Sequence, residues 1–133
     1  MRMKPALTSA DAQKMMAACK AEAQKNKWNV TIAIVDDSGA GLLLERMDGA
    51  GPISAQVAMG KARTSAATKR PTKFWEDRVK EKPAFVTFPS GGVLFQGGLP
   101  IMHQGECVGA IGVSGVQSHQ DAQVAQAGAD AVK

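Results

Sequence analysis

The segment Cys107–Ser114 sets the strongest limit on what this chain can fold into. It is uncharged, and its small and β-branched residues alternate between two faces that are both apolar. Such a strand is typical of the interior of a sheet that is covered on both sides. Glycine weakens a strand unless a helix or a ligand comes close to its backbone. We therefore predict that Gly109 and Gly112 lie in a central, tightly packed strand.

The same glycines also match the spacing of a phosphate-binding loop, since Gly109, Gly112 and Gly115 recur at every third residue. That loop joins a strand to a helix, whereas two of these glycines fall inside the predicted strand. No Lys-Ser or Lys-Thr pair follows them either. Packing is therefore favoured over phosphate binding.

Capping and turn signals order the first half of the chain. Thr8 and Asp11 resemble a capping box ahead of a helix over 9–26. The turn 36–39 (DDSG) joins two strands of a hairpin, 28–36 and 41–47. Pro52 suits the first turn of a second helix that ends at Pro71. The spacing predicts that this helix buries a narrow stripe of residues: Ile53, Val57, Gly60, Thr64 and Ala67.

The second half is predicted to be richer in strands. Thr72 is expected to cap a short helix through about Val79. Residues 80–91 are expected to be irregular, because prolines and glycines interrupt any period there. Three strands are predicted next: Val93–Gln96, Leu99–His103 and Cys107–Ser114. Ser118 and Asp121 then form a second capping box, which opens the final helix.

This order predicts one α+β domain over residues 1–133, with a mostly antiparallel five-stranded sheet flanked by helices. The first and last strands are apolar on both faces, and so small a domain has few helices to cover them. The pattern therefore indicates association of identical subunits.

Charge and hydropathy limit the kinds of partner that the protein is expected to bind. The net charge is +4, and basic residues gather between Lys61 and Lys82. No nucleic-acid-binding motif accompanies them, so we expect a solvated helix face or an anionic small ligand in place of nucleic acid. No segment has the pattern of a signal peptide or a membrane span. We expect a cytoplasmic protein without membrane contact, in which Cys19 and Cys107 are reduced thiols.

Metal or haem ligation has four candidate side chains: Met47, His103, Cys107 and His119. None has the spacing of a zinc site, so we predict no metal centre. His103 flanks the predicted turn at Gln104-Gly105, where a surface histidine is the simpler interpretation. His119 falls in the first turn of the last helix, whose dipole disfavours a charged imidazole.

A polar cluster follows the predicted hairpin. Arg46 and Asp48 stand where the second strand ends, and they form either a surface ion pair or the mouth of a ligand pocket. In the pocket hypothesis the other contributors come from two later segments. They are Lys61 and Thr64 of the next helix, with the backbone amides of Gly97 and Gly98.

Several segments, taken in order, carry a resemblance to a known family. They are 34–39 (IVDDSG), 45–50 (ERMDGA), 61–66 (KARTSA), 97–101 (GGLPI), 108–115 (VGAIGVSG), 120–121 (QD) and 125–129 (AQAGA). Together they cover nearly the whole chain and resemble the GlcG/HbpS-like family. That family also includes the C-terminal domain of PduO-type corrinoid adenosyltransferases.

The resemblance implies a profilin-like α/β sandwich and homo-oligomers that are often octamers. Some members bind haem, and many others are encoded in catabolic operons. This chain has no histidine before His103, so a haem ligand in the N-terminal half, as in the PduO-type domain, has no counterpart. The segment 69–96 is more similar to the catabolic, GlcG-like members.

Two hypotheses follow. The first is a homo-oligomeric binding protein for a small ligand, with haem or a related tetrapyrrole as the leading candidate. Its ligand contacts would be Arg46, Asp48, Lys61, Thr64, Gly97, Gly98 and, as the axial ligand, His103. The alternative is an enzyme or accessory protein of a catabolic pathway that acts on a small carboxylated metabolite, with Asp48 or His103 as acid–base. The sequence does not decide whether the protein is catalytic.

Overall fold

Strands β1 (Thr31–Asp36) and β4 (Glu106–Ser114) form the interior of an antiparallel sheet in the computed structural model, which describes residues 1–89 and 92–133. The strand order is β2-β1-β4-β3, with β2 (Gly41–Arg46) and β3 (Gly98–His103) at the two edges. β4 is buried from Cys107 to Val113, which confirms the prediction of a central strand covered on both faces.

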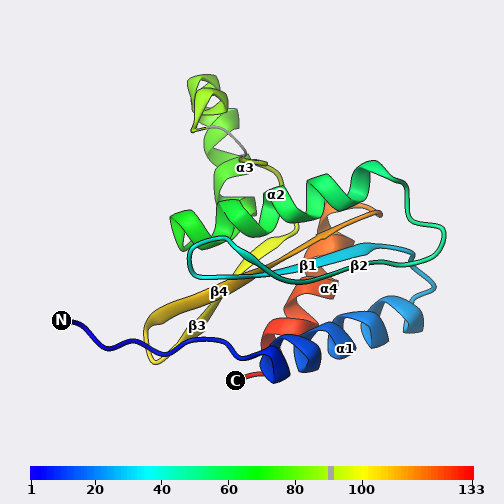
Figure 1. Ribbon diagram of the computed structural model, residues 1–133. Coiled ribbons are helices and arrows are strands. Elements are labelled where there is room, and N and C mark those ends of the chain that lie inside the picture. Colours follow the sequence, from blue (N-terminus) through cyan, green and yellow to red (C-terminus); the bar gives the residue numbers. More distant parts are fainter. Residues whose placement is uncertain (90–91) are drawn as a thin grey trace.

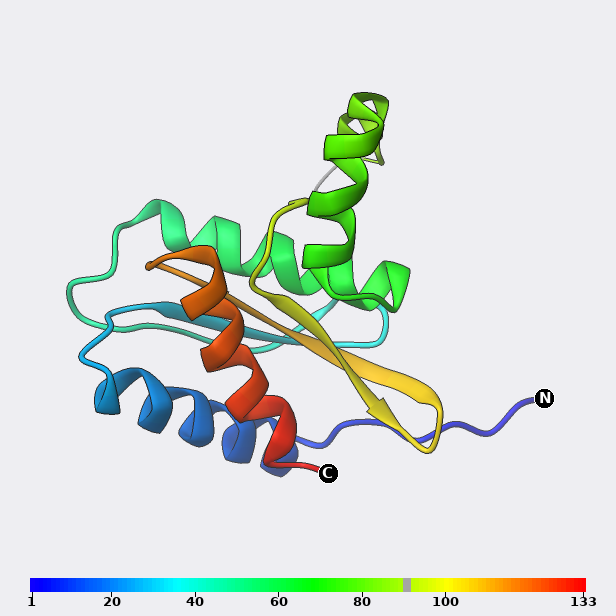
Figure 2. The same cartoon turned by 180° about the vertical axis from the view of Figure 1, so that it is seen from behind.

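Helices cover both faces of this sheet (Figures 1 and 2). α1 (Ser9–Lys25) and α4 (Ser118–Asp130) pack on one face, and α2 (Ile53–Thr68) crosses the other. On the α2 face, a Cβ atom added to Gly112 would come within 1.9 Å of the Ala58 carbonyl oxygen. Glycine is therefore required there for close packing, as the sequence predicted.

A short lobe stands out from this layered body (Figure 1). It consists of α3 (Thr72–Glu81) and the 3-10 helix η1 (Pro83–Thr87). Its aromatic rings pack on one another, with the centroid of Trp75 5.0 Å from that of Phe74 and 4.8 Å from that of Phe88. The lobe is thus held mainly by its own contacts.

The predicted fifth strand is wrong: the described residues form a four-stranded sheet, and Val93–Gln96 is a loop. Its backbone amides bond to helix side chains and not to a neighbouring strand. Val93 N donates to Thr64 Oγ1 (2.9 Å), and Gln96 N donates to Glu76 Oε1 (3.2 Å). The segment was predicted to be a strand, but side-chain acceptors on α2 and α3 bind its backbone amides instead.

The buried face of α2 is rotated from its predicted position. Gly60 and Thr64 of the predicted stripe are buried, but Ile53 is 65% exposed and Ala67 is also exposed. The small residues Ser54, Ala58 and Ala62 face the sheet instead. A helix that crosses a sheet at close range buries its smallest residues, even where a larger apolar one stands next to them.

Two further expectations concern caps and strand faces. The capping box of α1 is present, with Asp11 N donating to Thr8 Oγ1 (3.1 Å). The box of α4 is formed by Gln117 and Gln120, so the predicted Ser118–Asp121 box is wrong. The side chains of β4 were expected to alternate regularly between the two faces of the sheet. A bulge interrupts this alternation, so Val108 packs in the same cluster as Ile111.

Candidate functional site

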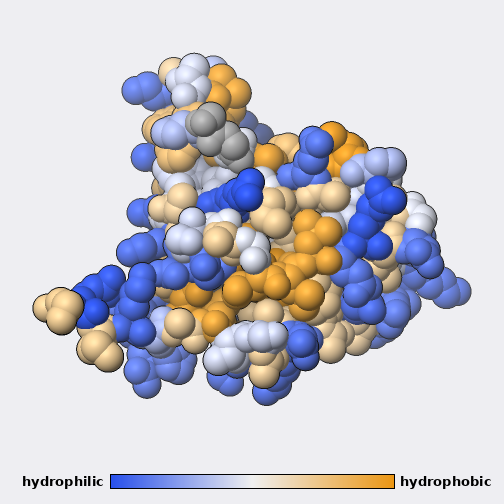
Figure 3. All heavy atoms as spheres, viewed as in Figure 1, coloured by the Kyte–Doolittle hydropathy of each residue, from blue (hydrophilic) through white to orange (hydrophobic). Residues whose placement is uncertain are grey.

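A groove runs beside α2 on the face of the sheet that this helix covers. We call it the α2 groove; its volume is about 550 Å³, and its walls include Leu44, Ile53, Met59, Arg63 and Val93. Figure 3 shows apolar side chains gathered in the middle of this side of the molecule, with hydrophilic ones around them. The volume falls within the range of about 300–1,000 Å³ that small-molecule sites occupy.

The sheet supplies one wall of the groove. Leu44 of edge strand β2 pairs with Ala33, which belongs to the cluster of small residues under α2. Residues two apart on a strand share a face, so Arg46 lies on the same face as Leu44. Arg46 therefore stands near one end of the groove, where β2 ends.

Arg63 marks the other end. Its Nε donates to the Gly39 carbonyl oxygen (3.3 Å), which holds the guanidinium against the tip of the β1–β2 hairpin. Arg63 also lines an adjoining cavity of about 380 Å³, together with Thr64 and Phe88. Among the described residues, the terminal nitrogens of Arg63 have no protein partner. A planar cation with spare donors is suited to binding a carboxylate.

A buried ion pair connects α2 to α4. The Lys61 side chain is fully buried, and its Nζ donates to the Val113 carbonyl (2.9 Å) and to Asp121 Oδ2 (3.1 Å). Burial lowers the pKa of Lys61 and raises that of Asp121, while the attraction between the two charges opposes both shifts. Asp121 Oδ1 also accepts from Val116 N (3.1 Å). The pair thus joins α2, β4 and α4.

The segment 92–98 is fastened over this ion pair. The ring of Phe95 lies 4.8 Å from Lys61 Nζ, within cation–π distance. Gly98 N donates to Thr72 Oγ1 (2.8 Å), and Thr64 holds Val93 as described above. Because Val93 lines the α2 groove, the buried Lys61 and the loop above it position one wall of the groove.

The structure brings four of the seven predicted site residues together. Lys61, Gly97 and Gly98 are in contact, and Thr64 lies one helical turn from Lys61. Gly97 has a φ of 136°, and a Cβ atom there would lie 2.6 Å from Lys61 Nζ. The ammonium group of Lys61 and the amide of Gly98 already have protein partners. These residues therefore support the groove wall from inside the protein.

The other three predicted residues lie elsewhere. Arg46 and Asp48 follow the far edge of the sheet from Gly98, three strand spacings or about 14 Å away. His103 is at the opposite end of β3 from Gly98. It lines a separate cavity of about 180 Å³ with Leu7, Asp11 and Met102.

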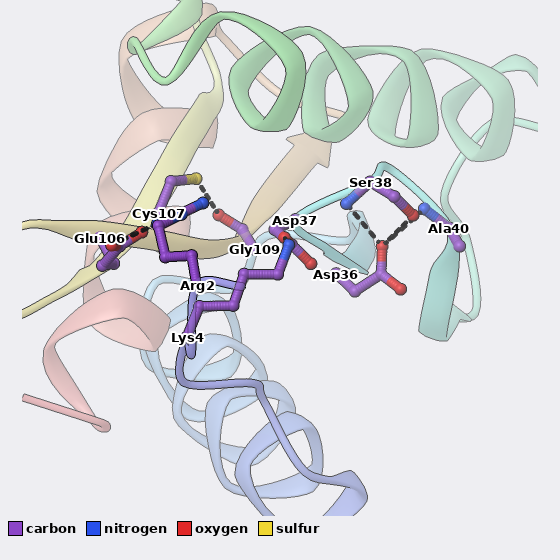
Figure 4. Close-up of polar contacts among 9 residues, drawn as sticks. All are labelled: Arg2, Lys4, Asp36, Asp37, Ser38, Ala40, Glu106, Cys107 and Gly109. Carbon is purple, nitrogen blue, oxygen red and sulfur yellow. Dashed lines mark hydrogen bonds and ion pairs between the residues drawn. The ribbon is translucent and has the colours of Figure 1, made fainter.

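The N-terminal segment closes that end of the molecule (Figure 4). Arg2 Nη1 pairs with Glu106 Oε1 at 2.5 Å, and Lys4 pairs with Asp37 of the hairpin turn. Nearby, Asp36 Oδ1 accepts from Ser38 N (2.8 Å) and Ala40 N (3.0 Å), which fixes the turn as its sequence predicted. These contacts tie residues 2–7 across the ends of two hairpins.

The thiols show no sign of activation. Burial raises the pKa of Cys19 to about 12 and also raises that of Cys107, whose Sγ donates to the Gly109 carbonyl (3.4 Å, Figure 4). A thiol must lose its proton to act as a nucleophile or metal ligand. Over residues 1–89 and 92–133, no three His, Cys, Asp or Glu side chains are placed to hold a metal ion. In the same ranges, no helix is long and apolar enough to cross a membrane.

Two residues of the groove were not predicted from the sequence, for a single reason. Met59 and Arg63 were not singled out, because the predicted buried stripe pointed α2 in the wrong direction. The spacing of Ser54, Ala58, Ala62 and Ser65 carries the correct signal, since small residues at every third or fourth position mark a close-packed helix face. Asp121 was missed because its position suited a helix cap.

These features define a class: a small α+β domain with a sheet sealed by two helices on one face and a ligand-sized groove beside one helix on the other. The family model described as "Haem degrading protein HbpS-like" matches residues 7–130, and the chain belongs to this family. The resemblance drawn from the sequence is confirmed.

Relatives and solved structures agree. Protein GlcG of Escherichia coli (strain K12) is 46% identical over 115 residues, which cover 86% of this chain and 85% of GlcG. A double mutant of Streptomyces reticuli HbpS has the same fold, with a TM-score of 0.92 at 34% identity, over 100% of this chain and 91% of that chain. A PduOC–haem complex matches with a TM-score of 0.89 at 29% identity, over 96% of this chain and 95% of that chain. Haem binding is therefore found within this family.

Proposed function

We propose that this protein is a cytoplasmic, homo-oligomeric binding protein for haem or a related tetrapyrrole, which it holds in the α2 groove. The observation that carries the proposal is the groove itself: about 550 Å³, apolar along its walls, with Arg63 at one end. The haem complex of PduOC, a relative of the same fold, supports the choice of ligand.

The groove residues suit such a ligand. Leu44, Ile53 and Val93 offer apolar contact to a macrocycle, and the guanidinium of Arg63 offers charged hydrogen bonds to its carboxylates. Arg46, on the same strand face as Leu44, places a second cation at the opposite end of the groove. Bound haem would supply redox-active iron, and the chain would orient it and exclude water from one face.

The cavity beside His103 does not suit the same ligand. Its volume of about 180 Å³ is well below the range of about 300–1,000 Å³ for drug-sized ligands. We therefore assign the macrocycle to the α2 groove. Lys61, Thr64, Gly97 and Gly98 contribute by positioning the Val93 wall, and Asp48 by its place next to Arg46 at the strand end.

Self-association is the second part of the proposal. β2 is an edge strand that carries Leu42 (38% exposed) and Leu44 (42% exposed). An edge strand with exposed apolar side chains is a ready site for pairing with another chain. A second copy on β2 would also deepen the groove, and octamers remain the expectation for the assembly.

A titration tests the ligand. Hemin added to the purified protein should give a saturable shift of the Soret band, and Arg63→Ala should weaken the affinity by about fivefold to tenfold, the range for one partly exposed charged hydrogen bond. Arg78→Ala, on the exposed side of α3, is the matched control and should bind like the wild type. No saturable shift, or equal weakening by both variants, would contradict the proposal.

A second candidate function rests on the small cavity. His103 lines it with the Asp11 carboxylate, and its size suits a small metabolite and not a macrocycle. In this alternative, the protein acts on a small carboxylated metabolite with His103 as acid–base. Turnover of such a substrate that His103→Gln abolishes and Arg63→Ala leaves intact would favour it.

A further inference from the structure

Among the described residues that line the α2 groove, one side chain is of a type that commonly ligates haem iron. Proteins use His, Cys, Met or Tyr for this purpose. The chain has no tyrosine, and both cysteines are buried away from the groove. His103 lines the small cavity at the other end of β3. Met59 is the remaining candidate on the groove wall.

We infer that Met59 Sδ is the axial iron ligand of a tetrapyrrole held in the α2 groove, with Arg63 binding its carboxylates. This inference rests on the proposed function and adds the ligand of the metal to it. It differs from the expectation that His103 is the axial ligand.

The helix places the two side chains suitably. Met59 and Arg63 are four residues apart on α2, so they project from the same side one turn apart. Both line the groove. A flat ligand along this side of α2 would therefore meet the thioether within the apolar part of the groove and the guanidinium at its end.

Met59 lies between the α2 groove and the core. It is partly buried and packs against the small-residue cluster formed by Ala33, Ala58 and Ala62. Its Cε lies against Gly41, 3.4 Å from the position that a Cβ atom there would occupy, which is an ordinary van der Waals contact. Methionine has three rotatable side-chain bonds and a polarizable sulfur, so its side chain adapts to its surroundings.

The chemistry of a thioether gives a direct test. A methionine ligand raises the reduction potential of haem iron. Ligation by Met59 therefore predicts a potential that falls when Met59 is replaced by a residue that cannot bind iron.

The experiment compares hemin complexes of the wild type, Met59→Leu, Met3→Leu and His103→Ala by absorption and electron paramagnetic resonance spectroscopy, with potentiometry. Leucine conserves the volume of methionine, so Met59→Leu should fold and should bind hemin within about tenfold of the wild type. Its absorption spectrum should differ from that of the wild-type complex, and its potential should be lower. Met3→Leu, at an exposed terminal position, is the matched control and should change neither.

The outcomes separate the inference from the proposed function. A wild-type complex that Met59→Leu leaves spectroscopically unchanged would overturn the inference alone. A spectrum that His103→Ala changes and Met59→Leu does not would overturn it in favour of the histidine. Absence of hemin binding by the wild type would overturn the proposed function, and the inference with it.

Discussion

The two faces of the sheet are packed with side chains of different size. The face under α1 and α4 is packed with large side chains, among them Met15, Ile32 and Ile111. The face under α2 is packed with alanines, and the buried Lys61–Asp121 pair connects α2 to α4 on the other face. Large apolar residues seal the first face. Small residues bring α2 down onto the second, so that the edge of the helix and strand β2 enclose a groove.

The difference separates two tasks. On the first face, each side chain contributes stability in proportion to the apolar area it buries. On the second, the burial is small and the position of the helix is specified by backbone contact and by one ion pair. We therefore expect substitutions on the first face to change stability alone, and those on the second to change ligand binding as well.

The largest expected effect comes from breaking the ion pair. Lys61→Met leaves the Asp121 carboxylate buried without its cation, and should lower the free energy of unfolding by about 3–5 kcal/mol. Urea unfolding followed by circular dichroism measures it. Adding Asp121→Leu removes the orphaned charge, so the double variant should recover much of the loss. A single variant as stable as the wild type would show that the pair is not what holds α2.

Next in size is a test of close packing. Gly112→Ala places a methyl group against the Ala58 carbonyl and the Ala62 amide, so α2 must move outward. We expect a loss of about 1–3 kcal/mol in stability together with weaker hemin binding. Gly51→Ala is the control, because nothing lies within 4 Å of the added methyl group. If Gly112→Ala bound hemin with unchanged affinity, the distance of α2 from the sheet would not control ligand binding in the α2 groove.

A smaller effect is expected on the sealed face. Ile111→Val removes one methylene from the α1/α4 core and should cost about 0.5–1.5 kcal/mol. Hemin affinity per folded molecule should stay at the wild-type value, as measured by titration well below the unfolding temperature. A loss of affinity there would show that the two faces are coupled after all.

The smallest effect concerns pH. The hydrogen bond from the Ser38 hydroxyl, with those from the turn amides, lowers the pKa of Asp36 from 3.8. A lowered pKa in the folded state means that this stabilisation is present above pH 3.8 and is lost as the pH falls through the folded-state value. Asp36→Asn should therefore show less loss of stability between pH 7 and pH 3 than the wild type. Ser38→Ala should fall between the two; an identical pH profile for all three would exclude this contribution.

The sequence predicted strands and caps best where a local pattern decides the outcome. The uncharged run at 107–114, the 36–39 turn and the Thr8–Asp11 cap depend on neighbouring residues, and the structure confirms all three. Val93–Gln96 was mispredicted because its partners, Thr64 and Glu76, are distant in sequence. A strand-like pattern alone could not reveal them.

The candidate site was harder to predict for a related reason. Lys61 was predicted to contact the ligand, whereas the structure buries it against Asp121. Asp121 comes sixty residues later and was interpreted as part of a helix cap, so the pair was not foreseen. Arg63 and Met59 depend on which way α2 faces. A rotation of α2 by about 100°, the angle between successive helix residues, exchanges the residues of the groove wall with those of the core. The spacing of the small residues reveals the correct direction.

The separation of Lys61 from Asp121 also bears on how the chain is made. During synthesis, α2 leaves the ribosome well before β4 and α4 do, because Asp121 follows Lys61 by 60 residues. Until then β1 lacks its inner neighbour, and the ammonium of Lys61 has neither the Val113 carbonyl nor the Asp121 carboxylate to bind. A nascent chain that stops before residue 121 therefore lacks the carboxylate that pairs with Lys61, and α2 is tied to α4 only when the last helix emerges.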